Sequence, residues 1–127
     1  MNELIGAVRQ RRSRRSYEDQ PITGEDVRAL ENGFSGLPML PDARVVLLPR
    51  APAGMFTGWL LGVYGKVQSP SAFVIVGDAR VEVGAAPAGY VGEAAVLEAT
   101  RLGLGTCWIG GGFKKRKTAD LVELAPG

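Results

Sequence analysis

Apolar residues recur at helical spacing in two segments near the start of the chain. Residues 2–12 carry three apolar side chains on one face, which predicts a short helix that ends where a run of arginines begins. A second helix is predicted from Thr23, a favourable N-cap residue, to Gly33, which we expect to stop it. A weaker helical pattern over residues 54–66 is interrupted by three glycines.

The longest helical pattern runs over residues 88–105. One apolar stripe repeats at intervals of three or four residues, and further apolar residues widen it to most of the circumference. The stripe consists of Val91, Ala95, Ala99 and Leu102. Such a helix belongs in the middle of a domain, and Gly103 is expected to end it.

Three short apolar runs alternate with these helices and predict strands. Two are rich in β-branched residues, over residues 43–48 and 71–78, and the third is the Thr-Cys-Trp-Ile segment at 106–109. A last helix is predicted from Thr118. This order of elements is typical of an α/β or α+β domain with helices on both faces of its sheet.

The composition excludes several kinds of chemistry. The chain has 127 residues, one cysteine and no histidine, so it forms no internal disulfide, Cys/His zinc site or histidine-dependent catalytic site. No metal site and no catalytic side chain are predicted, and a cofactor would carry any reaction. The length fits one domain over residues 1–127. Without an apolar run long enough to span a membrane, we expect a cytoplasmic protein.

The positive charge is concentrated in two runs, Arg9 to Arg15 and Lys114 to Lys117. These runs hold nine of the fifteen basic residues, which leaves six basic against thirteen acidic residues in the rest of the chain. Such a distribution fits either an anion-binding site or a solvated face. A nucleic-acid binder is a third interpretation, but no aromatic residues are interleaved with the charges and no zinc or helix-turn-helix pattern accompanies them.

Glycine-rich motifs of nucleotide-binding proteins are absent. The segment GLGTCWIGGG has Trp108 where the dinucleotide fingerprint needs its third glycine, and it follows a helix instead of a strand. No glycine loop is followed by Gly-Lys-Ser/Thr. Cys107 is interpreted as a small buried residue. The three consecutive glycines fit either close approach of a flat ligand or a plain loop.

Three segments together resemble a known family. They are RQRRSRRSYEDQPIT near the N-terminus, YGKVQSPSAFVIVGD in the middle, and GYVGEAAVLEATRLGLGTCWIGGGF late in the chain. In this order they are similar to the FMN-dependent nitroreductases, also called NAD(P)H-flavin oxidoreductases, and most of all to a divergent branch with two halves in one chain. The resemblance implies an α+β nitroreductase-like fold, with a mixed sheet sandwiched by helices.

The resemblance also implies a set of flavin contacts. In that family the opening arginines and serine hold the FMN phosphate and ribityl chain, a role that falls here on Arg11, Arg12, Ser13 and Arg15. The backbone contacts to the N5 edge of the flavin fall on Gly110, Gly111 and Gly112. Guanidinium groups and a hydroxyl at a chain turn suit a phosphate ester. Hydride would pass from NAD(P)H through the flavin to a nitro compound, a quinone or a related acceptor.

Two departures from the family pattern qualify this interpretation. The segment GFSGLPMLPDARVV lacks the asparagine and glutamine that contact flavin in most members, and the chain stops at VELAPG, where the family continues. We therefore expect a domain that is incomplete at its C-terminus and pairs with a second copy or with a missing half. The alternatives to an enzyme are an inactive flavin-binding or structural remnant and the basic nucleic-acid binder.

Overall fold

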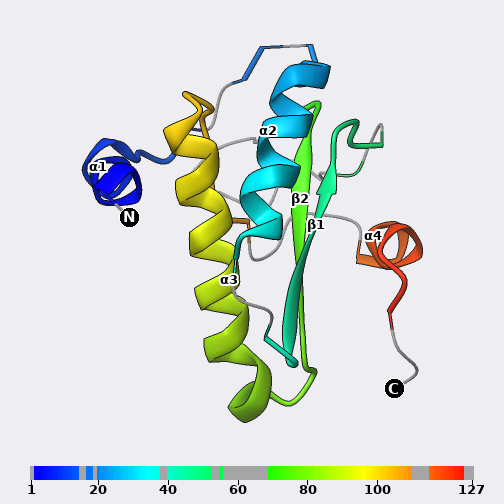
Figure 1. Cartoon of the computed structure of the whole chain (residues 1–127). Helices are drawn as coiled ribbons and strands as arrows, with labels where there is room; N and C mark the ends of the chain where they lie inside the picture. The colour runs from blue at the N-terminus through cyan, green and yellow to red at the C-terminus, as the bar shows by residue number, and fades with distance from the viewer. Residues whose placement is uncertain are drawn as a thin grey trace.

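The computed structural model describes residues 2–14, 17–18, 20–37, 40–52, 55, 69–109 and 115–124. Within these ranges the chain forms four helices and one two-stranded sheet (Figure 1). In chain order they are α1 (Asn2–Gln10), α2 (Gly24–Ser35), β1 (Ala43–Leu48), β2 (Ala72–Gly77), α3 (Val81–Arg101) and α4 (Lys115–Leu121). The predicted α+β class is confirmed. The helix predicted over residues 54–66 lies outside the described residues, apart from Met55.

The two strands pair antiparallel, with Ala43 opposite Gly77 and Leu48 opposite Ala72. The expected mixed sheet is therefore not found in the described part of the chain, where the parallel contact is one isolated bridge between Ser13 and Thr106. The strand predicted at 106–109 is wrong, because the residues after this bridge have no regular structure. The Ser13 side of this bridge follows directly after α1, which ends at Gln10.

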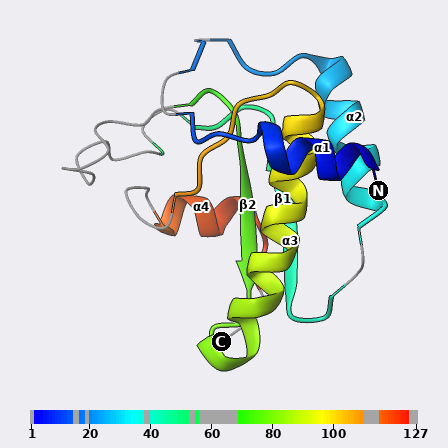
Figure 2. The same ribbon diagram turned by 90° about the vertical axis from the view of Figure 1, so that its left-hand side faces the viewer.

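Helices lie on both sides of the sheet (Figures 1 and 2). On one side α3 contacts both strands, and α1 and α2 pack against α3. Phe34 of α2 also meets Phe73 of β2 edge to face, with the ring centroids 5.7 Å apart. On the other side lies α4, and Arg44 of β1 donates hydrogen bonds to the backbone carbonyls of Val122 and Glu123, just beyond this helix.

The central position predicted for the long helix is confirmed. Its buried face includes Val91, Ala95, Val96 and Ala99, each no more than 5% exposed. All four side chains are small or β-branched, so neighbouring elements can approach α3 closely. The helix begins seven residues before the predicted start at Ala88, and Pro87 is accommodated inside it.

The start of α3 is held by local contacts. The carboxylate of Asp78 accepts hydrogen bonds from the backbone N–H and the guanidinium of Arg80, the residue that precedes the helix. Gly84 lies so close to this turn that a Cβ atom would stand 2.3 Å from the carbonyl oxygen of Asp78. The sharp approach of the turn to the helix therefore requires glycine at this position.

The predicted helix ends were partly right. Gly103 follows α3 with a φ of +81°, and the N–H groups of Gly103 and Leu104 donate to the carbonyls of Thr100 and Ala99. This is the hydrogen-bond pattern of a Schellman motif, which glycine favours. The cap at Thr23 is also confirmed, since its hydroxyl accepts a hydrogen bond from the N–H of Asp26 at 3.1 Å.

The stop predicted at Gly33 is wrong. The second helix continues to Ser35, and Gly33 instead faces the Glu98 side chain, where a Cβ atom would lie 2.7 Å from Oε2. Glycine serves helix packing here, not helix termination. The last helix begins at Lys115, three residues before the predicted start, and ends at Leu121.

Candidate functional site

The basic segment that follows α1 lies against the segment that follows α3. Ser13 and Thr106 form the parallel bridge, and the N–H of Arg14 donates to the carbonyl of Thr106 at 2.8 Å. A Cβ atom on Gly105 would lie 2.8 Å from Cγ of Arg14, so a glycine allows this approach. This junction of the Arg11–Arg14 and Gly105–Trp108 segments joins two of the motifs on which the predicted flavin site depends.

Arg11 and Ser13 face each other in this junction. The guanidinium Nη2 of Arg11 donates to the hydroxyl of Ser13 at 3.3 Å, and its Nε lies 4.0 Å from Oε1 of Glu93 on α3. The Arg11 side chain is 24% exposed. Its Nη1 atom is buried and has no hydrogen-bond partner among the described residues. The group therefore has donor capacity that the described contacts do not use.

Arg12 is engaged differently. Its Nη1 donates to the backbone carbonyls of Arg9 at 3.1 Å and Arg11 at 2.8 Å. These carbonyls lie at the C-terminal end of α1, where a cation is favoured by the helix dipole. The residue is exposed, and its two other nitrogen atoms make no hydrogen bond within the described part of the chain. Its predicted role as a phosphate contact stays a prediction.

A second carboxylate contact ties the junction to the core helix. The indole Nε1 of Trp108 donates to Oε2 of Glu93 at 2.9 Å, while Oε1 of the same carboxylate lies near Arg11. The edge of the indole ring lies against Gly92, because a Cβ atom there would stand 2.3 Å from Cη2 of Trp108. Glu93 therefore links the basic segment and the Trp108 ring.

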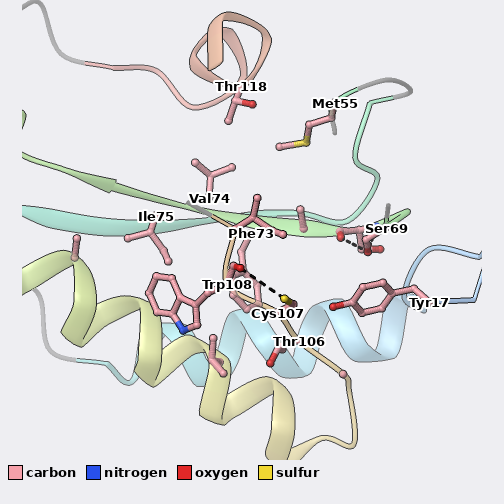
Figure 3. Close-up of a pocket in the computed structure, with 16 residues that line it drawn as sticks. Tyr17, Met55, Ser69, Phe73, Val74, Ile75, Thr106, Cys107, Trp108 and Thr118 are labelled. Carbon is pink, nitrogen blue, oxygen red and sulfur yellow. Dashed lines mark hydrogen bonds between the residues drawn. The ribbon is translucent and has the colours of Figure 1, made fainter. Parts of the chain in front are cut away.

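A cavity of about 360 Å³ lies beside this junction (Figure 3). Its walls come from β2, from the segment 105–109, from two residues of α3 and from one residue of α4. Most of the lining is apolar, and it includes Met55, Phe73, Val74, Ile75, Val96 and Trp108. Tyr17 also lines the cavity, and its hydroxyl donates to the carbonyl of Arg14. The size is in the range of about 300–1,000 Å³ that is usual for small-molecule sites.

Four of the predicted site residues lie outside the described residues: Arg15, Gly110, Gly111 and Gly112. Of the other three, the structure brings Arg11 and Ser13 together and places Arg12 on the backbone. The sequence motifs did not point to Glu93 or to a role for Trp108. The only signal for Glu93 was its place among the few charged residues of a predicted core helix.

Cys107 is half-buried and lines the cavity. In the described ranges no group of three or more histidine, cysteine, aspartate or glutamate side chains is arranged to hold a metal ion. A search of the same residues found no helix with the length and apolar character needed to cross a membrane.

The largest shift in pKa lies away from the junction, at the start of α3. The Arg80 side chain donates to Asp78 and, with the Arg80 backbone N–H, lowers the pKa of that carboxyl from 3.8 to about 2. The same contact raises the pKa of Arg80. Figure 1 shows this turn at the opposite end of α3 from α1. The pair therefore belongs to the start of the helix, not to the site.

Comparison with known proteins assigns the chain to a family. No curated protein matches it. A family model described as "Putative TM nitroreductase" matches residues 3–125, which is nearly the whole chain and includes both segments of the junction. The chain therefore belongs to this nitroreductase family.

Proposed function

We propose that this chain binds FMN and acts as a flavin-dependent oxidoreductase that takes hydride from NAD(P)H. The acceptor would be a nitro compound, a quinone or a related molecule. Membership in a nitroreductase family supports the proposal. Bound FMN supplies the hydride chemistry at its N5 atom, so the reaction does not require a histidine or another protein acid. The lack of histidine in the chain is compatible with this activity.

The junction of the Arg11–Arg14 and Gly105–Trp108 segments is the observation that carries the proposal. Its donor set suits a phosphate ester, because a guanidinium and a hydroxyl lie within hydrogen-bond distance of each other and both can donate to phosphate oxygens. Nη1 of Arg11 is a further donor that lacks a partner among the described residues. Arg11 and Ser13 would hold the phosphate, with Arg12 and Arg15 beside them.

The flavin ring would lie toward the glycine run. Gly110 follows Trp108 by two residues in the sequence, and Trp108 lines the cavity beside the junction. Main-chain N–H groups of Gly110, Gly111 and Gly112 would donate to the polar edge of the isoalloxazine and stabilise negative charge on the reduced ring.

A second copy of the chain, or a second half, would complete the site. Two apolar side chains of α1, Ile5 and Val8, are 52% and 60% exposed one turn apart. This helix leads directly into the Arg11 segment. A partner that covers these side chains would also enclose the phosphate contacts and exclude water from them.

The first test is flavin binding by the full chain. FMN and riboflavin are titrated separately, and flavin fluorescence is followed. We expect FMN to bind about ten- to a hundredfold more tightly than riboflavin, because only FMN has the phosphate. NADH and NADPH are then added without oxygen, and loss of the flavin absorbance reports reduction.

Each of the other outcomes corresponds to another function. Bound flavin that neither nicotinamide reduces would indicate an inactive flavin-binding remnant. Failure to bind FMN would contradict the proposal. Nucleic-acid affinity that falls linearly with salt on a logarithmic plot, in a protein that binds no flavin, would favour the basic nucleic-acid binder.

A further inference from the structure

We infer that Trp108 is the stacking surface for the isoalloxazine ring and that Glu93 is the residue that positions it. This inference rests on the proposed function, since it names the contacts of the same flavin. Neither residue is among the flavin contacts that the sequence predicts.

The indole of Trp108 is held by packing along its Cη2–Cζ2 edge and by a hydrogen bond from Nε1. Gly92 leaves room for the ring, since a Cβ atom there would overlap Cη2, and Ile75 of β2 approaches the same space, with Cδ1 2.5 Å from that Cβ position. The Nε1 hydrogen bond to Glu93 then fixes the direction of the ring plane. A ring held by packing and by one polar contact is preorganised for binding.

Trp108 as a residue is nevertheless 45% exposed, which is a large fraction for a tryptophan with a satisfied N–H. Figure 3 shows it between the sheet and α3, beside the cavity. The cavity lining next to it is mainly apolar. A flat, mostly apolar ring would therefore find an aromatic surface and apolar walls in one place.

The occupant is identified by the contact between Glu93 and Arg11. One carboxylate oxygen accepts from the indole and the other lies 4.0 Å from Nε of Arg11. Trp108, the proposed stacking residue, and Arg11, the proposed phosphate contact, thus both lie next to the carboxylate of Glu93. A ligand with a flat ring at one end and a phosphate at the other would use both, as FMN does.

Riboflavin is the probe for this test, because it has the ring of FMN without the phosphate. Trp108→Leu should lower the affinity for both riboflavin and FMN by about tenfold, which is the usual effect of removing an aromatic stacking partner. Tyr90→Leu is the matched control, since Tyr90 is an exposed aromatic residue of α3 that does not line the cavity. It should leave both affinities unchanged.

The positioning role has its own pair of variants. Glu93→Ala removes the acceptor of the indole N–H and should weaken riboflavin about threefold to fivefold, while Glu93→Gln keeps an acceptor and should retain wild-type affinity. A carboxylate that acted only through its charge would give the same result in both variants, because riboflavin is uncharged. Equal riboflavin affinity in the Ala and Gln variants would therefore overturn the role of Glu93.

The outcomes separate this inference from the proposed function. If FMN binds and Trp108→Leu leaves riboflavin affinity unchanged, the stacking surface is wrong and the proposed function stands. If the wild-type chain binds neither flavin, both are overturned. If the Leu variant does not fold, Trp108→Phe is the second test. Its affinity for riboflavin should stay within about threefold of wild type. The fluorescence emission of bound riboflavin should rise, because a phenyl ring quenches flavin far less than an indole does. Unchanged emission would overturn the inference.

Discussion

The two basic runs of this chain carry similar numbers of cations, five and four, in different structural surroundings. In the first run, the Arg11 side chain contacts Ser13 and Glu93, Arg12 caps α1, and the backbone of Arg14 pairs with Thr106. In the second run, residues 115–117 open α4 and are exposed. Their side chains form no ion pair or hydrogen bond with the rest of the described chain.

The difference follows from the secondary structure of each run. A helix turns by about 100° per residue, so consecutive side chains point in different directions and remain separately solvated. An extended segment beside a second segment instead holds its side chains in place relative to that neighbour. Charge density in a sequence thus indicates an anion site only when the tertiary structure provides the neighbouring segment.

The largest effect is expected at Gly92, against which the Trp108 ring packs beside the first basic run. Gly92→Ala would place a methyl group 2.3 Å from the Trp108 ring, and should lower the free energy of unfolding by about 1–3 kcal/mol. Gly89→Ala, in the same helix, meets no atom within 4 Å and should stabilise by about 0.5–1 kcal/mol. Thermal unfolding of both variants checks this. Equal melting temperatures would show that the ring is not seated on Gly92.

The difference between the two basic runs can be tested by removing one cation from each run and measuring FMN affinity. Arg11→Ala should lower the affinity for FMN by about ten- to a hundredfold, since one charge-assisted contact to the phosphate is lost. Lys117→Ala should leave FMN affinity unchanged because the residue is exposed on α4. Fluorescence titrations of the two variants give the answer. An equal loss in both would mean that FMN responds only to net charge.

Arg44 connects β1 to the end of α4, the helix that carries the second basic run. Arg44→Met removes its hydrogen bonds to the carbonyls of Val122 and Glu123 and should destabilise α4 locally by about 1–2 kcal/mol. Hydrogen exchange of the amides in α4 should accelerate, while α3 stays protected. Arg50→Met, at another exposed position, is the control. Unchanged exchange in α4 would show that this helix is held by other contacts.

A smaller effect is expected from the charge next to Arg11. Glu93→Gln removes a negative charge that a bound phosphate would face, and should raise the ratio of FMN to riboflavin affinity about fivefold, as expected for charges a few ångströms apart near water. Riboflavin affinity should not change. A lower ratio would mean that the carboxylate holds Arg11 in its binding position more than it repels the phosphate.

The smallest effect concerns the Asp78–Arg80 pair at the start of α3. Because the pKa of Asp78 is lowered from 3.8 to about 2 in the folded chain, its contribution to stability is present above pH 4 and is lost as the pH falls toward 2. Asp78→Asn should therefore melt slightly below wild type at pH 6, and the gap should close near pH 2. A gap independent of pH would point to a cause other than ionisation.

The sequence by itself determined the elements whose signals are local. The apolar stripe predicts the buried face of α3, Thr23 and Gly103 cap their helices as expected, and β1 coincides with a β-branched run. Three motifs in order were enough for the family, which the match over residues 3–125 confirms. These features depend on neighbours within a few residues, so a reading of the chain in order can find them.

Only the tertiary structure decided how the distant segments meet. Gly33 looked like a helix stop and instead makes room for Glu98, and the predicted strand at 106–109 is reduced to one bridge with Ser13. The Trp108–Glu93–Arg11 contacts join three segments that no local pattern connects. Periodicity reports which face of an element is buried, whereas the identity of the group across from it depends on packing between segments far apart in the chain.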